Sequence, residues 1–217
     1  MLFYYRVDRR LAVGSPWCRW LISRAPTSVV LKCNRTFPPY HPTTRMCLSL
    51  ILHILQERSY QDLVDVGCGS GILALAGLKL GIGRAVALDI DPQALKLSRI
   101  NGQLNGLASR LMLVKGSAET VAGCFDLVLA NLPMQVLTEK LPELCRLSRA
   151  GGGLVLSGFQ DLDKPLLQEK LKHQGLKEKS WLSADLSFFG EPPTGSFTWM
   201  AVLAQRGGTA QGLRHRA

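Results

Sequence analysis

The sequence predicts an α/β fold: a doubly wound, mainly parallel, seven-stranded sheet with a small β-rich cap at its N-terminus. Two observations lead to this prediction. Short apolar runs alternate along the chain with stretches of helical length, which is typical of consecutive βα units. In addition, residues 63–73 read LVDVGCGSGIL, an apolar run followed by a glycine-rich turn and then by a second apolar stretch of helical length.

The glycine-rich turn is the first candidate site. Gly67, Gly69 and Gly71 lie between the predicted strand at 63–66 and the predicted helix at 72–80. Such a turn brings free backbone N–H groups close to a ligand, and a Cβ there would block the approach. The dinucleotide fingerprint needs a third glycine where this chain has Ile72, so the pattern is G-x-G-x-G. A tight βα turn without a ligand is the simpler alternative.

A second element supports the ligand interpretation. The apolar run at 85–90 ends at Asp89, which is 22 residues beyond Gly67. An acidic residue at about this distance binds the ribose hydroxyls of a nucleotide. We assign that role to Asp89, whereas Asp91 and Pro92 read as the N-cap and first residue of the next helix.

Composition limits the class of protein. The 217 residues and 47% apolar content suit one domain with appendages. No apolar run reaches about 18 residues, so we predict no transmembrane helix. The six cysteines form no C-x-x-C pair, which argues against a zinc site or a disulfide framework and predicts a reducing, cytoplasmic location. No metal site is expected.

The net charge of +10 belongs to the ends of the chain. Residues 1–45 hold eight basic residues against Asp8 alone, and residues 206–217 hold three arginines. The remainder is neutral, so we divide the chain into a basic N-terminal cap or substrate-recognition segment at 1–40, a main domain at 41–205 and a disordered basic tail at 206–217. A cleaved presequence is the alternative for the first segment. If the cap is separable, removing residues 1–34 should spare ligand binding.

The remaining elements follow from turn signals and periodicity. In the cap, strands are expected at 2–5, 11–13, 17–22 and 29–31. A helix is expected at 44–58 with Thr43 as its N-cap, and another at 92–105, ending before Gly106. The later strands are expected at 110–114, 125–130, 154–157, 181–186 and 197–204, with helices at 135–149 and 163–174.

Ligands in doubly wound sheets bind beyond the carboxyl ends of the strands. The glycine turn, Asp89, Ser117 and Asn131 all follow such ends, so one site is expected to collect them. Glu119 is open to two interpretations: an acceptor for an adenine amino group, or a solvated carboxylate at a helix start.

Four segments in order resemble the ribosomal protein methyltransferases of the PrmA type: HPTTR at 41–45, DVGCGSGILALAGLKLG at 65–81, ALDIDPQAL at 87–95 and LANLP at 129–133. The resemblance covers about residues 36–204. It implies a class I methyltransferase sheet and S-adenosylmethionine as cofactor. It also implies Thr44, Gly67, Asp89 and Asn131 as cofactor contacts. To these we add four neighbouring positions of the same motifs, Asp65, Gly69, Gly71 and Ile90. We also add Ser117 and Ala118, which follow the strand expected at 110–114 and could meet an adenine ring.

The resemblance implies methyl transfer to an amino group, most simply that of a lysine, in a protein such as a ribosomal protein. Asn131 is the candidate catalytic residue, because its side-chain oxygen and the Leu132 carbonyl can accept the N–H groups of an incoming amine. His41 either accepts a proton or shapes the lid over the cofactor. Two departures concern that lid and the substrate. The family's F-G-T-G-x-H lid is FPPYH here, and about 35 residues precede it where the family has a whole recognition domain.

Two other functions compete. Base N-methylation of RNA or DNA is favoured by the basic ends, which predict possible nucleic-acid contacts. However, the aromatic residue that stacks on a flipped base is replaced by Met134. A cofactor-binding scaffold without activity is the third possibility. The sequence does not predict an oligomeric state.

Overall fold

The computed structural model describes residues 2–33, 39–186 and 196–207. The predicted strand at 197–204 and the start of the predicted tail fall inside these ranges, whereas Phe37, Pro38 and residues 208–217 lie outside them. Within the described residues, every helix is too short or too polar to cross a membrane.

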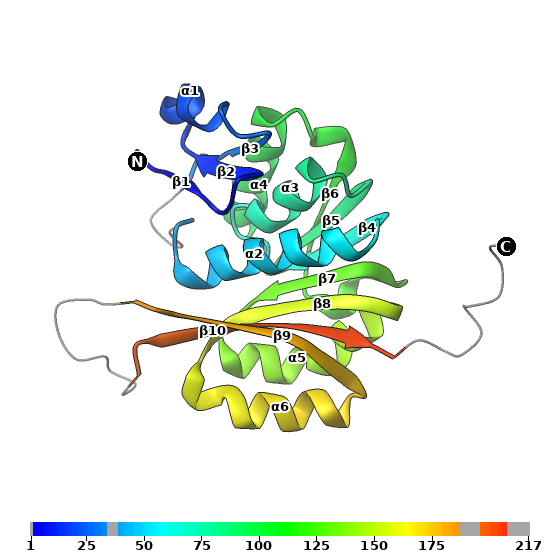
Figure 1. Ribbon diagram of the computed structural model, residues 1–217. Helices are drawn as coiled ribbons and strands as arrows, with labels where there is room; N and C mark the ends of the chain where they lie inside the picture. The colour runs from blue at the N-terminus through cyan, green and yellow to red at the C-terminus, as the bar shows by residue number, and fades with distance from the viewer. Residues whose placement is uncertain (1, 34–38, 187–195, 208–217) are drawn as a thin grey trace, which may run out of the picture.

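A seven-stranded sheet forms the centre of the molecule, as predicted (Figure 1). Its strand order is β6-β5-β4-β7-β8-β10-β9, and only β10 runs against the other six. The strands are β4 (Asp62–Val66), β5 (Arg84–Asp89), β6 (Leu111–Lys115), β7 (Phe125–Asn131), β8 (Ser148–Gln160), β9 (Leu176–Asp185) and β10 (Thr198–Arg206).

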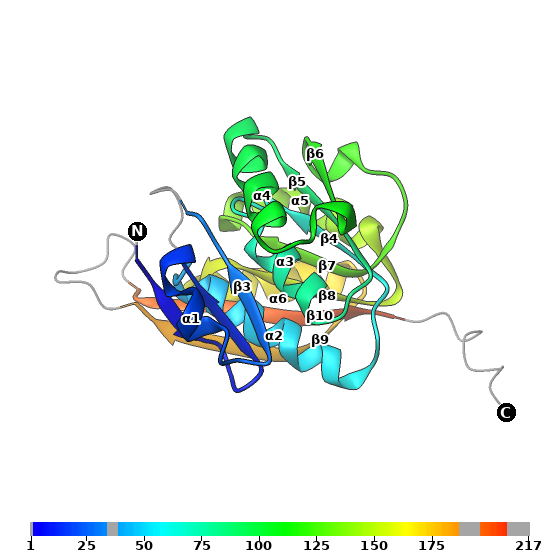
Figure 2. The same ribbon diagram turned by 90° about the horizontal axis from the view of Figure 1, so that it is seen from above.

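Helices cover both faces of this sheet because alternate side chains of the buried strands are apolar on each face. One face carries α2 (Pro42–Glu57), α3 (Ile72–Lys79) and α4 (Pro92–Leu104), and the other carries α5 (Met134–Leu147) and α6 (Lys164–His173) (Figures 1 and 2). The chain runs from β4 outward through β5 to β6 and returns to β7 on the other side of β4. This reversal makes the carboxyl ends of β4 and β7 the expected place for a ligand.

The N-terminal segment is a separate three-stranded sheet of β1 (Tyr4–Arg6), β2 (Leu11–Gly14) and β3 (Thr27–Val30). The strand expected at 17–22 is wrong: Pro16–Cys18 forms a 3-10 turn that continues into α1 (Arg19–Ile22). Only Cys18 and Ile22 of this stretch are buried, four residues apart as on a helix. A crossover is also needed here because β2 and β3 are parallel.

This small sheet is not a detached module. Leu11, Val13, Val29 and Leu31 belong to the same buried cluster as Met46 of α2 and the residues of α3. Removing residues 1–34 would therefore expose apolar surface of the main domain. The structure thus argues against using that truncation as a clean test of substrate recognition.

Several further boundaries differ from the predictions. Strand β9 begins at Leu176 rather than at residue 181, β10 includes Arg206, which was assigned to the tail, and α2 and β8 begin earlier than expected. Helix α2 begins at Pro42, with His41 rather than Thr43 as its N-cap: His41 Nδ1 accepts the Thr43 N–H at 3.4 Å. Proline suits the first helical position because it has no N–H to leave unpaired. Strand β8 includes the glycines at 151–153, which lie between the helix predicted at 135–149 and the strand predicted at 154–157. They belong to the strand because an irregularity in its pairing with β7 accommodates Gly151 in the left-handed region.

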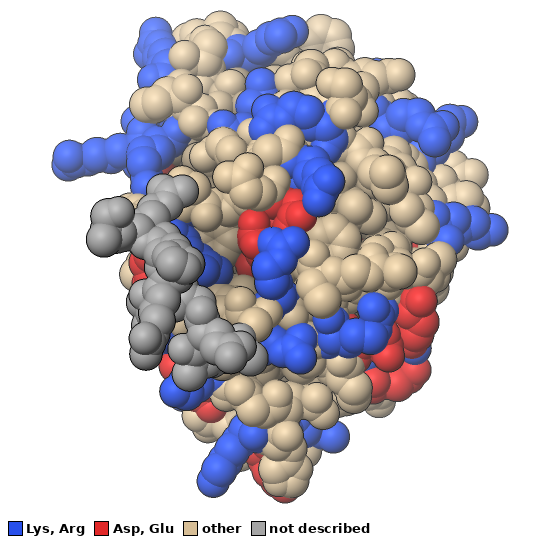
Figure 3. All heavy atoms as spheres, turned by 90° about the vertical axis from the view of Figure 1, so that its right-hand side faces the viewer, with Lys and Arg blue, Asp and Glu red and all other residues tan. Residues whose placement is uncertain are grey.

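The edge that holds the amino ends of the parallel strands is stabilised by ion pairs. Asp62, at the start of β4, accepts from Arg84 at 2.9 Å and lies within 3.5 Å of Arg149, which also binds Asp126. In Figure 3, where this side faces the viewer, lysine and arginine residues (blue) cover more of the surface than aspartate and glutamate residues (red). These carboxylates are used structurally and lie at the opposite edge from the predicted site.

Short 3-10 turns at Ala108–Arg110, Ala118–Thr120 and Asp161–Asp163 complete the described secondary structure.

Candidate active site

A cavity of about 600 Å³ opens at the carboxyl ends of β4, β5 and β7. Eight of the ten residues that we predicted from sequence line it: Thr44, Asp65, Gly67, Gly69, Asp89, Ile90, Ser117 and Asn131. This volume is within the range of sites for small molecules and cofactors. The motifs that are spread over residues 44–131 thus meet in one place, as the strand-end argument predicted.

Gly71 and Ala118 are not among the lining residues. Gly71 is the N-cap of α3, and a Cβ there would lie 2.9 Å from Ser98 Oγ, so its packing already requires glycine. Ala118 is fully buried, and its carbonyl accepts from Arg146. Contacts of these two residues with a ligand remain predictions.

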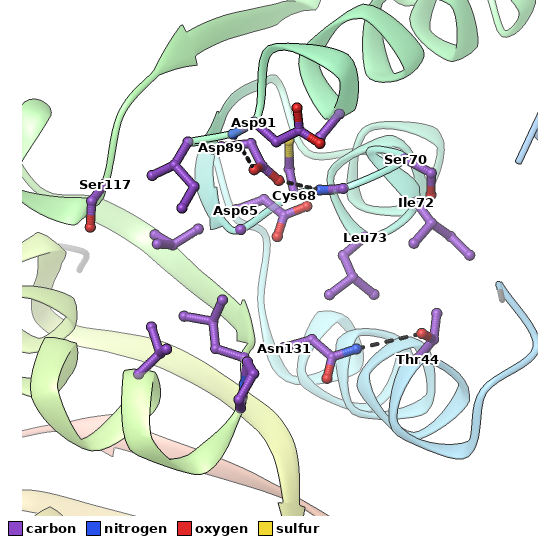
Figure 4. Close-up of a pocket in the computed structure, with 18 of the residues that line it drawn as sticks. Thr44, Asp65, Cys68, Ser70, Ile72, Leu73, Asp89, Asp91, Ser117 and Asn131 are labelled. Atoms are coloured by element: carbon purple, nitrogen blue, oxygen red, sulfur yellow. Dashed lines mark hydrogen bonds between the residues drawn. The ribbon is translucent and has the colours of Figure 1, made fainter. Parts of the chain in front are cut away.

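The carboxylate of Asp89 is held in place by the backbone (Figure 4). Its Oδ2 accepts the N–H of Gly69 at 2.9 Å, and its Oδ1 accepts the N–H of Asp91 at 2.9 Å. Each carboxylate oxygen can accept a further hydrogen bond. The two oxygens are therefore oriented to receive a pair of hydroxyl groups at the rim of the cavity. Asp91 itself caps α4 by accepting the Gln93 N–H at 2.8 Å, as predicted.

Asp65 lies deeper, at the end of β4, and is almost fully buried. Its Oδ2 accepts the N–H of Ala74 in the first turn of α3 at 3.2 Å. Burial raises the pKa of Asp65 to about 7, the Ala74 hydrogen bond opposes this rise, and the nearby Asp89 charge adds to it. A positive charge in the cavity would favour the ionised form of Asp65.

The wall of the cavity is acidic. Asp65, Asp89 and Asp91 line it, and Lys140 is the single cationic side chain among the described lining residues. Lys140 is itself paired with Glu119 at 2.7 Å and with Glu139 at 2.8 Å. Such a wall favours a cationic ligand and disfavours the pyrophosphate of a dinucleotide. Glu119 is engaged by Lys140 and does not line the cavity, so it matches the solvated carboxylate better than the adenine acceptor.

Asn131 lies at the carboxyl end of β7, across the cavity from Asp65 and Asp89 (Figure 4). Its Nδ2 donates to Thr43 Oγ1 at 3.2 Å and to Thr44 Oγ1 at 3.5 Å. Its Oδ1 is buried and accepts no hydrogen bond from the described residues. A buried acceptor without a donor is costly unless a ligand satisfies it. Asn131 is thus a lining residue with an acceptor that the described residues do not satisfy.

A hydrogen-bonded chain fixes the orientation of the Asn131 amide. Thr43 Oγ1, which accepts from Asn131, lies 2.8 Å from His41 Nδ1, so the threonine hydroxyl can donate to that nitrogen. The His41 ring packs edge-on against Trp199 at 5.0 Å, and burial lowers its pKa. His41 is not a lining residue, which supports its shaping role over that of a proton acceptor.

Two glycines that hold Leu132 in place were not predicted from the sequence. A Cβ on Gly67 would lie 2.4 Å from Leu132 Cδ2, and one on Gly158 would lie 2.2 Å from the Leu132 carbonyl oxygen. Gly158 has φ +99°, which disfavours any other residue. Leu132 therefore fits between two glycines, and this fit sets the position of Asn131 beside it. Gly158 directly follows the strand predicted at 154–157, but its local sequence does not indicate that it contacts Leu132.

Polar residues of α4 that support the glycine turn were also missed. Ser98 Oγ donates to the Gly69 carbonyl at 2.8 Å, and Asn101 Nδ2 donates to the Ser70 carbonyl at 2.9 Å. Both side chains are fully buried. Their spacing of three residues places them on one face of the helix. A pair of polar residues on the buried face of a predicted helix could have indicated this supporting role from the sequence.

A family model described as ribosomal protein L11 methyltransferase (PrmA) matches residues 39–185, which span every lining residue of the cavity. The chain belongs to this family. It is similar to ribosomal protein L11 methyltransferases of Pelobacter propionicus (42% identity over 71% of this chain and 51% of that protein) and of Dechloromonas aromatica (43% identity over 71% of this chain and 50% of that protein). The chain thus spans about half the length of the curated relatives that it matches.

A solved structure described as a ribosomal protein L11 methylase from Lactobacillus delbrueckii subsp. bulgaricus matches with a TM-score of 0.78 at 25% identity. The match covers 94% of this chain and 98% of that one, so the two folds agree over nearly all of both chains.

Methyltransferases of this class use S-adenosylmethionine, and the cavity fits it. Asp89 would receive the ribose hydroxyls, and the acidic wall suits a ligand with a sulfonium and an ammonium group. The exposed apolar side chain of Ile90, next to Asp89, offers an apolar surface at the cavity. Within the described part of the chain, no three His, Cys, Asp or Glu side chains converge as a metal site would require.

Proposed function

We propose that this chain transfers a methyl group from S-adenosylmethionine to an amino group of a protein, most simply a lysine of a ribosomal protein. The names of its relatives support the class of substrate. The observation that carries the proposal is the buried, unpartnered Oδ1 of Asn131 beside the acidic cavity. We also infer a cytoplasmic location, in keeping with six free cysteines.

When bound, S-adenosylmethionine supplies an electrophilic methyl carbon, so the protein mainly has to position the acceptor. Asn131 Oδ1 accepts one N–H of the incoming neutral amine, which directs the nitrogen lone pair toward the cofactor. Thr43 and Thr44 prevent the amide from rotating, because both accept from its Nδ2. The Leu132 carbonyl remains a predicted second acceptor.

Base methylation is less well supported. Residue 134, where a base-modifying enzyme would carry a stacking ring, is the methionine that begins α5. Without an aromatic ring at this position, a flipped base would have to be held in the cavity by other side chains.

The test uses purified protein, S-adenosylmethionine labelled in its methyl group, and dissociated large ribosomal subunits from cells that lack this protein. We expect label in a protein band that is sensitive to protease and resistant to ribonuclease. Label in RNA would instead support base methylation. Thermal unfolding with and without the cofactor is measured in parallel, because a ligand that binds only the native state must stabilise it. Absence of stabilisation would contradict cofactor binding, and stabilisation without any label would support the scaffold alternative.

A further inference from the structure

The N-terminal sheet carries an exposed aromatic and basic surface that the methyl-transfer site does not use. We call it the N-terminal aromatic patch; it comprises Tyr4, Arg6, Trp17, Arg19, Trp20 and Arg24. Trp17 is 80% exposed and Trp20 is 63% exposed, which is unusual for the largest apolar side chain. Large exposed aromatic groups of this kind mark interaction surfaces.

The residues of this patch form one connected surface. Arg24 lies over the Trp20 ring at 5.5 Å, and Arg6 donates to the Arg24 carbonyl at 3.5 Å and to the Tyr4 hydroxyl at 3.2 Å. Trp17 and Trp20 are three residues apart across the 3-10 turn and α1, so they lie on the same side of this helical segment. In Figures 1 and 2, α1 projects from the small sheet away from α5 and α6.

The charge of this surface has one sign. Residues 2–33 hold six basic side chains and a single acidic one, Asp8, which is already paired with Arg10 at 3.0 Å. No carboxylate among the described residues forms an ion pair with Arg6, Arg19 or Arg24. These cations are therefore available to a polyanion.

We propose that the N-terminal aromatic patch binds single-stranded RNA. Exposed rings on which bases stack, interleaved with cations that bind phosphates, are the two components of single-strand recognition. A protein partner fits less well, because the centre of a protein interface is depleted of charge and here three arginines are interspersed with the rings. A membrane surface fits less well because α1, at four residues, is too short for an interfacial amphipathic helix.

The choice of RNA over DNA rests on the proposed function, since a ribosomal substrate brings RNA with it. A basic patch would not attract the lysine side chain that receives the methyl group, because both are cationic. In this arrangement the patch binds nucleic acid next to the substrate while the cavity receives the amine. RNA would thus contribute to affinity for an assembled particle.

The test measures the fluorescence anisotropy of a labelled twelve-nucleotide oligouridylate with the full chain. We expect saturable binding that Trp17→Ala combined with Trp20→Ala weakens at least about tenfold, since stacking contributes strongly for each base. Arg19→Ala combined with Arg24→Ala should weaken binding and reduce the slope of log affinity against log salt by about 1.4, or about 0.7 for each lost phosphate contact. Lys172→Ala combined with Lys177→Ala removes the same charge from exposed positions elsewhere and should leave the slope near its original value.

Three results would overturn the proposal: no binding by the unaltered protein, equal binding by the double tryptophan variant, or equally tight binding of polyglutamate. The last would indicate an acidic protein partner. Stabilisation by S-adenosylmethionine is measured for every variant, because it reports an intact fold and does not involve the patch. If S-adenosylmethionine did not stabilise the unaltered protein, that result would contradict the proposed function and would not affect the RNA-binding result.

Discussion

The side chain of Asn101 joins the N-terminal sheet to the glycine turn through Ser70. Its Nδ2 donates to the Ser70 carbonyl at 2.9 Å and to the Lys32 carbonyl at 2.9 Å, while its Oδ1 accepts the Lys32 N–H at 2.8 Å. The residue is completely buried. Both donor hydrogens of its amide, and one acceptor site of its oxygen, are thus used between the segments of Lys32 and Ser70, so the turn that lines the cavity depends on the chain that follows β3.

This relationship predicts that Asn101→Ala weakens S-adenosylmethionine binding about three- to tenfold, because a buried carbonyl of the turn loses its donor. Asn105→Ala is the matched control: Asn105 makes a similar pair of bonds with Val30 of the small sheet and none with the glycine turn. Both variants should lower the unfolding temperature, and calorimetric titration should separate them by affinity. Equal affinity of the two variants would show that the Ser70 bond does not matter.

Asp89→Asn is predicted to weaken cofactor binding by about one to two orders of magnitude, since hydrogen bonds to a charged acceptor are worth about 1.5–3 kcal/mol. An amide would also direct its NH₂ at the N–H of Gly69 or of Asp91. Asp91→Asn keeps a good helix cap and is expected to change affinity much less. The measurement is titration calorimetry, and similar losses in both variants would contradict the assignment of the ribose to Asp89.

Asn131→Ala is predicted to reduce the methylation rate by roughly 30- to 1000-fold, or about 2–4 kcal/mol, because its Oδ1 should act mainly in the transition state. The fold should persist, and cofactor affinity should fall only modestly. Asn131→Asp keeps acceptors but adds charge beside the sulfonium, so it tests whether the neutral amide matters. Single-turnover rates at saturating cofactor provide the comparison. A normal rate in the alanine variant would place the acceptor elsewhere.

Thr43→Val is predicted to lower the rate about tenfold with little change in KM, because Asn131 loses the closer of its two threonine partners. The residue is fully buried, and valine has nearly the same shape. Thr43→Ser restores the hydroxyl and should restore the rate. If serine failed to rescue, the effect of valine would be attributed to packing rather than to orientation of the amide.

The pH dependence of stability should report Asp65. Its pKa is about 7 in the folded protein, raised mainly by burial, whereas an unfolded aspartate titrates near pH 4. Between these values the folded state holds more protons than the unfolded state, so this carboxyl lowers stability as pH rises from about 4 to 7. Asp65→Asn should remove this decline. Urea unfolding without ligand would measure it from about pH 4.5 to about pH 7.5, which covers most of the interval between the two pKa values. An unchanged decline would indicate that Asp65 ionises normally.

The sequence by itself determined the parts of this protein that depend on local patterning. The apolar runs mark the strands and helices. The ends of α4 are set by residues next to it in sequence, namely Asp91 and Pro92 at its start and Gly106 after its end. The meeting of Gly67, Asp89 and Asn131 was predictable too, because parallel strands bring their carboxyl ends to one edge.

Only the tertiary structure decided what supports that site. The strand expected at 17–22 is helical because a parallel β2–β3 pair needs a crossover. The roles of Asn101 and Gly158 depend on segments that lie far away in sequence, Lys32 and Leu132 respectively. A residue's local pattern records its own secondary structure and burial, but the partner that satisfies a buried amide, or crowds a glycine, is set by how the chain packs.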